Sequence, residues 1–185
     1  MARILPNTDS RPRNHVGRGF TLIELLVVIG IVGVTTALIL SGVTRARAVA
    51  RSAGCMANLR QIHQAFYQYA LDNDKRYPDP QAVGNSWEAL LQQYMSGPAA
   101  FACPADSEIF PEVGSSYDWR DMPNPITTLA GRPVSAVTRS TAVLAFDTLP
   151  GWHEKHVMNA IRIDGSAEEL REEDCLGDLR VPVAP

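Results

Sequence analysis

The chain has 185 residues, a formal net charge of -3 and a hydrophobic fraction of 45%. This length leaves room for one long helix and one small domain, and the overall charge lacks the basic excess that attracts a phosphate backbone. From Asp72 to the C-terminus, 18 Asp and Glu outnumber 9 Lys and Arg. We therefore expect no nucleic-acid binding by this part of the chain.

A polar, basic N-terminal stretch precedes an uncharged apolar run. Residues 1–19 contain four arginines and one acid, Asp9, and they end in an Arg-Gly pair just before Phe20. From Leu25 to Thr44 no residue is charged, and a helix of about 20 such residues spans the hydrocarbon of a bilayer. Residues 1–19 are predicted to be a leader and residues 20–44 a transmembrane and assembly helix.

Glu24 is the one carboxylate at the start of this apolar segment. An isolated acid in a bilayer costs about 2.5–3.5 kcal/mol on insertion scales, so Glu24 needs a partner. Hydrolysis between Gly19 and Phe20 would supply one, because it creates an α-amino group near the same helix end. Paired between neighbouring subunits, the amine and the carboxylate would neutralise each other and select an axial register.

The sequence Gly-Phe-Thr-Leu-Ile-Glu-Leu-Leu-Val-Val-Ile at residues 19–29 resembles the class III signal of type IV pilins and type II secretion pseudopilins. In that family a prepilin peptidase cuts after the glycine and methylates the new N-terminal phenylalanine, and the glutamate guides filament assembly. The resemblance implies cleavage between Gly19 and Phe20, N-methylation of Phe20 and an assembly role for Glu24. It also implies that the N-terminus is cytoplasmic before cleavage, because the peptidase works at that face.

Two other targeting signals fit this segment less well. An ordinary secretory signal has an apolar region of about 7–15 residues and a cleavage site of small residues. Here the apolar run is longer, carries Glu24 and is followed by Arg45, Arg47 and Arg51. A plain signal anchor is the remaining alternative.

A helix is predicted to continue beyond the membrane as far as Leu71. Apolar residues recur at spacings of three and four, the pattern of one helical face; this face comprises Val49, Ala53, Met56, Leu59, Ile62, Phe66 and Tyr69. We expect residues 45–71 to form an amphipathic stem that docks on a sheet supplied by the rest of the chain. A coiled-coil stem is the alternative.

An oxygen-rich turn at Asp72, Asn73 and Asp74 ends this helix, and Pro78 prevents its continuation. Such a cluster could hold calcium, which the major pseudopilins bind in a C-terminal loop. No loop here has the ligand spacing of a known calcium motif. Calcium therefore stays open as a cofactor without assigned residues, and we expect no other cofactor.

Residues 72–185 are predicted to form a small head, which gives the whole chain an α+β fold with a long N-terminal helix packed on an antiparallel sheet. Ser86 is the expected N-cap of a short helix that reaches Tyr94. Residues 96–140 are rich in Pro, Gly and Ser and are expected to be irregular. Strands are predicted at residues 141–147, 157–163 and 166–170, with Asp164-Gly165 as a hairpin turn. The acidic and proline-containing residues that follow are expected to be loose.

The head extends the resemblance to a pseudopilin group abundant in planctomycetes, verrucomicrobia and their relatives. The matching segments are residues 55–62, 69–70, 72–74, 101–106 and 159–165. Proteins of that group end with a histidine, nine residues and Asp-Gly in a hairpin. Here ten residues separate His153 from Asp164 and seven separate His156 from it, so the motif is altered.

The three cysteines lack Cys-x-x-Cys or zinc-finger spacing, so the sequence predicts no metal site. A disulfide is more plausible in an oxidising periplasm. The related group carries Cys55 and Cys103 together, and the resemblance implies that they pair; Cys103 with Cys175 is the alternative. Because nothing in the sequence supplies an oxyanion hole or the third member of a Cys–His nucleophile, we expect no enzymatic activity.

Two function classes share the N-terminal signal. The first is a structural subunit of a type II secretion-like periplasmic pseudopilus, which the likeness of the head favours; the second is a type IV pilus subunit for adhesion, motility or DNA uptake. A membrane-anchored protein that never polymerises is a third class. The expected partners are prepilin peptidase, other pilin or pseudopilin subunits, an inner-membrane assembly platform and the lipid bilayer. The expected location is a single pass of the inner membrane with a periplasmic head.

Overall fold

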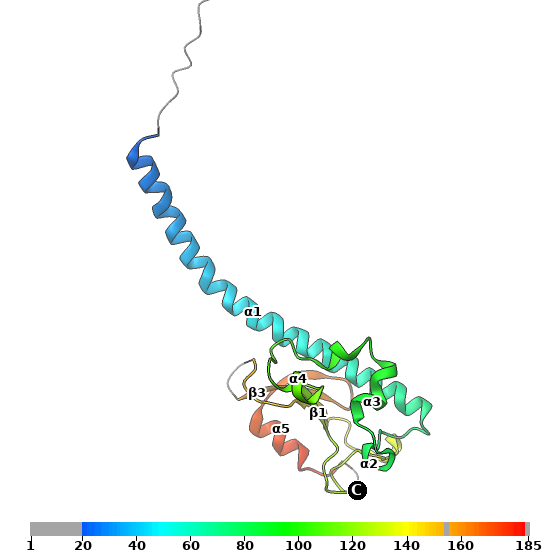
Figure 1. Ribbon diagram of the computed structural model, residues 1–185. Helices are drawn as coiled ribbons and strands as arrows, with labels where there is room; N and C mark the ends of the chain where they lie inside the picture. Colours follow the sequence, from blue (N-terminus) through cyan, green and yellow to red (C-terminus); the bar gives the residue numbers. More distant parts are fainter. Residues whose placement is uncertain (1–19, 154–155, 184–185) are drawn as a thin grey trace, which may run out of the picture. The chain divides into compact units, whose positions relative to one another are not determined.

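The computed structural model describes residues 20–153 and 156–183 (Figure 1). The chain divides into two compact units, with the boundary between Gly42 and Val43. The first helix, α1, runs from Leu22 to Asp72 and contributes to both units. The long N-terminal helix predicted from the sequence is therefore confirmed, with ends that differ by one or two residues.

In the first unit, the described side chains of α1 are exposed along its whole length. Leu22 is 82% exposed and Ile23 is 69% exposed, and the valines, leucines and isoleucines that follow are also exposed. Among the described residues, α1 is the helix that is long and apolar enough to cross a membrane. A contiguous apolar surface of this kind marks contact with lipid or with other helices.

The second unit contains a four-stranded antiparallel sheet with strand order β1-β2-β3-β4. Its strands are β1 (Tyr117–Trp119), β2 (Val143–Asp147), β3 (Val157–Arg162) and β4 (Ala167–Arg171). The last three correspond to the predicted strands, and together with α1 they confirm the predicted α+β fold. The hairpin between β3 and β4 also follows the prediction, with Gly165 in the left-handed region at φ 86°.

The sheet is buried on both faces (Figure 1). On one face the C-terminal half of α1 packs Leu59, Ile62 and Phe66 against side chains of the sheet, among them Trp119. On the other face lies a second apolar cluster, made of Val143, Phe146, Met158, Ala160, Cys175 and Leu179. The head is thus a three-layer arrangement of α1, the sheet and a C-terminal helix.

The buried face of the stem begins later than the sequence predicted. Val49 is 63% exposed and Ala53 is also exposed, whereas Leu59 is fully buried. The buried face instead starts at Ser52 and Cys55, because these two side chains meet polar groups of the head. Periodicity of apolar residues cannot detect a helix face whose first contacts are polar.

The acidic residues after β4 are not loose, and the prediction is wrong for them; residues 184–185 lie outside the described residues. Residues Glu172–Leu179 form helix α5, which buries Cys175 and Leu179 against the second cluster. The sequence hides this helix because most of its residues are charged or small, and only these two lie on the buried side.

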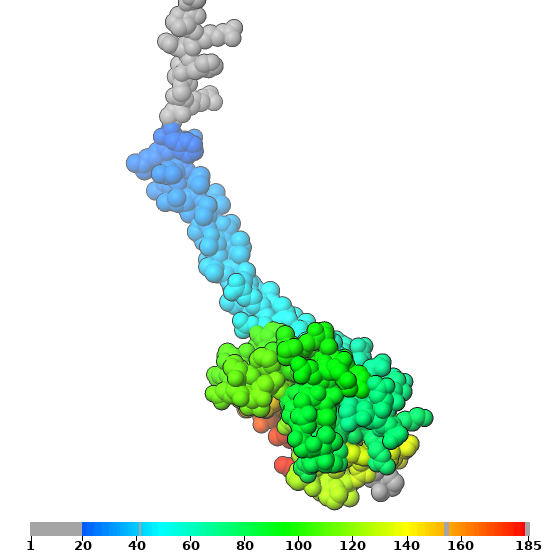
Figure 2. All heavy atoms as spheres, turned by 45° about the vertical axis from the view of Figure 1, so that its right-hand side comes forward, coloured from blue at the N-terminus to red at the C-terminus, as the bar shows by residue number. Residues whose placement is uncertain are grey.

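The excursion between α1 and β2 is more ordered than predicted. It holds the short helices α2 (Pro80–Val83), α3 (Trp87–Leu91), η1 (Gln92–Tyr94), η2 (Pro98–Phe101), α4 (Ile109–Val113) and η3 (Val134–Ala136), besides β1. The predicted cap of α3 is confirmed, because the Ser86 Oγ accepts a hydrogen bond from the Ala89 amide at 3.2 Å. Figure 2 shows this excursion, in green, over much of one face of the head.

Candidate processing and assembly site

Glu24 lies in the first turn of α1 and closes a reciprocal cap with Thr21. The amide of Thr21 and its hydroxyl both donate to Glu24 Oε2, at 2.9 and 2.8 Å. In return the Glu24 amide donates to Thr21 Oγ1 at 3.3 Å. This is a capping box, in which an N-cap threonine and an acid three residues later satisfy each other's free amides.

The cap leaves half of the carboxylate available. Both bonds from Thr21 go to Oε2, and no described residue donates to Oε1. The side chain of the preceding Phe20 is 78% exposed. Glu24 is therefore held in one orientation by its own helix while it presents one oxygen outward.

Phe20 is the first residue that the structure describes, so the leader and Gly19 lie outside the described residues. The geometry of the predicted cleavage site is consequently known only on its C-terminal side. Cleavage there would leave Thr21, and hence the cap on Glu24, in the mature chain.

The apolar helix beyond Glu24 carries small residues at intervals. At Gly30, Gly33 and Gly42 an added Cβ would meet nothing within 4 Å. Small residues in membrane helices allow the backbones of neighbouring helices to approach closely. This part of α1 can therefore pack against other helices as well as against lipid.

Cys55 and Cys103, the pair predicted to form a disulfide, are neighbours inside the head. Both are buried and both are free thiols in the structure. Cys55 lies on α1 and donates to Asp147 Oδ1 at 2.9 Å, while Cys103 contacts His153 Nε2 at 3.5 Å. Cys175, the alternative partner, lies in the second cluster on the opposite face of the sheet.

Hydrogen bonds around Cys103 favour a thiolate there beside a protonated His153. The pKa of Cys103 is lowered to about 6, mainly by its hydrogen bond with Cys55 and also by His153, against the effect of burial. Burial opposes protonation of His153, yet hydrogen bonds with Asp147 and Cys103 outweigh it and raise the pKa of His153 to about 9. Spacing along the sequence gave no sign of this cluster, since Asp147 and His153 are far from both cysteines in the chain.

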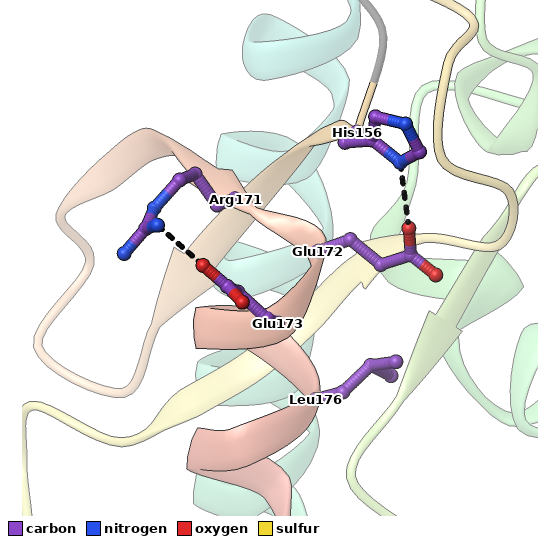
Figure 3. Close-up of a pocket in the computed structure, with 5 residues that line it drawn as sticks. All are labelled: His156, Arg171, Glu172, Glu173 and Leu176. Atoms are coloured by element: carbon purple, nitrogen blue, oxygen red, sulfur yellow. Dashed lines mark hydrogen bonds and ion pairs between the residues drawn. The ribbon is translucent and has the colours of Figure 1, made fainter.

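The two histidines that could match the altered motif have different surroundings. The side chain of His153 is 3% exposed, whereas that of His156 is 83% exposed. Figure 3 shows His156 at a surface pocket, where its Nδ1 lies 3.4 Å from Glu172 and where Arg171 pairs with Glu173. Only His153 is placed to act inside the head.

A family model described as the prokaryotic N-terminal methylation motif matches residues 16–40. The matched range includes Gly19, Phe20 and Glu24. Neither a curated protein nor a solved structure matches the chain.

The motif and the capped apolar helix indicate a prepilin-like precursor, of the class from which type IV pilins and pseudopilins are made. Such a motif implies processing by prepilin peptidase and assembly with other pilin subunits, and its family is structural rather than enzymatic. The single apolar helix at the N-terminus is consistent with a single-pass protein of the inner membrane.

Proposed function

We propose that the chain is a structural subunit of a type II secretion-like pseudopilus. Prepilin peptidase cuts it between Gly19 and Phe20 and methylates Phe20, and the mature chain polymerises through its apolar helix. The observation that carries this proposal is the exposed apolar helix whose one carboxylate, Glu24, is oriented by Thr21 and keeps Oε1 open.

The assembly contact follows from these groups. Cleavage creates an ammonium or methylammonium group on Phe20, and a carboxylate in lipid needs such a partner. Oε1 of Glu24 accepts this group from a neighbouring subunit, while Oε2 keeps the two bonds from Thr21. Since only one axial offset brings the two groups together, the pair selects the register of the filament.

The head supports the secretion class more than the surface-pilus class. It is small, it is acidic from Asp72 onward, and its sequence resembles the pseudopilin group whose histidine motif is altered here. In this proposal the head is periplasmic and the polymer acts with an inner-membrane assembly platform.

The experiment compares Glu24→Ala with Thr21→Ala in cells that process the precursor. Mass spectrometry of the mature N-terminus should find N-methyl-Phe20 in wild type and in both variants. Glu24→Ala should enter filaments poorly because the register-setting charge is gone, whereas Thr21→Ala keeps the carboxylate and should still assemble. A mature chain that starts elsewhere, or normal filaments from Glu24→Ala, would contradict the proposal.

A deletion strain separates secretion from surface pili. We expect loss of secreted proteins with surface filaments unchanged. Loss of surface filaments with normal secretion would assign the chain to a type IV pilus instead.

A further inference from the structure

Four buried side chains with metal-binding atoms meet between α1 and the sheet. Cys55 comes from α1, Cys103 from the loop after η2, Asp147 from the end of β2, and His153 from the segment that follows. One ligand atom from each of them lies within 4.8 Å of the others. The four residues come from four separate segments of the chain, so only the fold brings them together.

Two distances within the cluster match the edges of a tetrahedral zinc site. With Zn–S bonds of about 2.3 Å and Zn–N or Zn–O bonds of about 2.0–2.1 Å, the edges of a tetrahedron measure about 3.3–3.8 Å. The Cys103 Sγ and His153 Nε2 atoms are 3.5 Å apart, and His153 Nε2 is 3.4 Å from Asp147 Oδ2. Cys55 Sγ lies 2.9 Å from Asp147 Oδ1, which is the length of a hydrogen bond, so these two groups would move apart to admit an ion.

We propose that Cys55, Cys103, Asp147 and His153 bind one Zn²⁺ ion inside the head. Thiolate, imidazole and carboxylate all bind zinc, and structural zinc sites are closed and four-coordinate. The proposal stands on the head alone and does not depend on the assembly role of α1.

The buried carboxylate of the cluster suits a cation. Asp147 is 0% exposed, and His153 is its one ionic partner among the described residues. Burying a carboxylate is costly unless a positive charge compensates it. A divalent ion would supply that charge in place of a protonated His153, which would bind the ion as neutral imidazole.

Neighbouring groups already fix the orientation of the ligands. The backbone amide of Asn159 donates to Asp147 Oδ2 at 2.9 Å, and the backbone amide of Ala105 donates to Cys103 Sγ at 3.5 Å. The Tyr117 hydroxyl lies 3.2 Å from Cys55 Sγ. Outer contacts of this kind hold metal ligands in place. His153 differs: its Nε2 faces Cys103 and Asp147, while its buried Nδ1 has no partner among the described residues.

The ion would crosslink parts of the head that share little regular structure. It joins the stem to the end of β2 and ties down the loop that contains Cys103 and the segment that contains His153. A Cys55–Cys103 disulfide would use the same two sulfurs, so the two arrangements exclude each other in one molecule.

The test uses the full-length protein, purified in detergent from the cell envelope without chelators. Elemental analysis should find about one zinc per chain, consistent with a closed structural site. Under denaturing conditions with a chelator, all three cysteines should react as thiols. A Cys55–Cys103 disulfide, or protein that takes up no zinc after reduction, would overturn the proposal.

Two further measurements guard against variants that fail to fold. Co²⁺ added to the reduced wild-type protein should give the visible bands of tetrahedral cobalt and a thiolate charge-transfer band; octahedral cobalt spectra would overturn the site. Cys103→Ser should weaken zinc affinity by at least about 10–100-fold, which is the loss seen when only a hydrogen-bond partner of a metal ligand is removed. Cys175→Ser, which removes a buried thiol outside the cluster, should bind zinc as wild type does, and an equal loss in this control would contradict the assignment.

Discussion

Arg120 should be one of the strongest contributors to the stability of the head. Its side chain is fully buried and directs its N–H groups at acceptors from three segments. Nε donates to the Thr127 carbonyl at 2.8 Å, and the terminal nitrogens donate to Asp178 Oδ1 at 2.9 Å and to the Asp178 carbonyl at 3.0 Å. Further bonds reach the carbonyls of Val143, Leu179 and Val181. Arg120 thus holds the end of α5 and the segment after it to the sheet.

Replacement of Arg120 by Met should lower the free energy of unfolding by about 3–4 kcal/mol. Removing one partner of a buried ion pair costs about 3–5 kcal/mol. Asp178 would keep its pairs with Arg139 and Arg162, which places the expected loss at the lower end. The expected loss comes from the backbone carbonyls that Arg120 no longer bonds. Each buried carbonyl that water cannot reach costs about 1–3 kcal/mol without a donor.

Urea unfolding of the full-length protein in detergent micelles measures this loss, with the fluorescence of the buried Trp87 and Trp119 as the signal. At a slope of about 1–3 kcal/mol per molar urea, the midpoint should fall by about 1–4 M. Arg139→Met is the matched control, because Arg139 contacts the same carboxylate but is 30% exposed. The control should cost no more than about 1 kcal/mol. If Arg120→Met unfolds within about 1 kcal/mol of wild type, or no more readily than the control, the reasoning is refuted.

The same titration tests two further positions. Phe66→Ala should lower the free energy of unfolding by about 3–5 kcal/mol, since Phe66 is 1% exposed at the centre of the stem face. Tyr67→Ala is the control and should change little, because Tyr67 is 60% exposed. Equal effects of the two substitutions would argue against docking of the stem. Gly165→Ala should cost more than Gly84→Ala. Both glycines have positive φ, so replacement by alanine costs about 1–2 kcal/mol at either position. At Gly165 the new Cβ would also lie 3.1 Å from the His63 side chain, whereas at Gly84 it would meet nothing within 4 Å. Equal costs would show that this contact relaxes freely.

The N-terminal helix and the hairpins could be predicted because their signals are local. The uncharged apolar run, the absence of proline and apolar residues at spacings of three and four predict α1. Two short strand-forming segments on either side of Asp164-Gly165 predict the β3–β4 hairpin. The cap on Glu24 was not predicted, although the Thr-x-x-Glu sequence carries its signature. The structure shows the cap on Oε2, and the assembly role of Glu24 stays a prediction.

The parts that could not be predicted depend on polar contacts between distant segments. β1 is only three residues long, and α5 carries two buried side chains among charged neighbours, so neither has an apolar period to detect. Ser52 belongs to the buried face of the stem because its hydroxyl donates to Glu169 Oε1 at 2.7 Å and lies 3.1 Å from Asn159 Oδ1. The spacing of Cys55, Cys103, Asp147 and His153 matches no metal motif, although the folded chain brings their ligand atoms together.

Two groups of polar contacts hold the irregular segments of the head to the sheet and the stem. Much of the head is irregular, and backbone carbonyls in irregular segments must find donors other than a sheet ladder or a helix. On one face of the sheet Arg120 supplies those donors for the C-terminal segment. On the other face the groups around Asp147 join the stem to two loops. Because both groups of contacts lie in the second unit and Glu24 lies in the first, changes at Arg120 should lower the stability of the head, whereas changes at Glu24 should affect assembly and the first turn of α1 and leave the head folded.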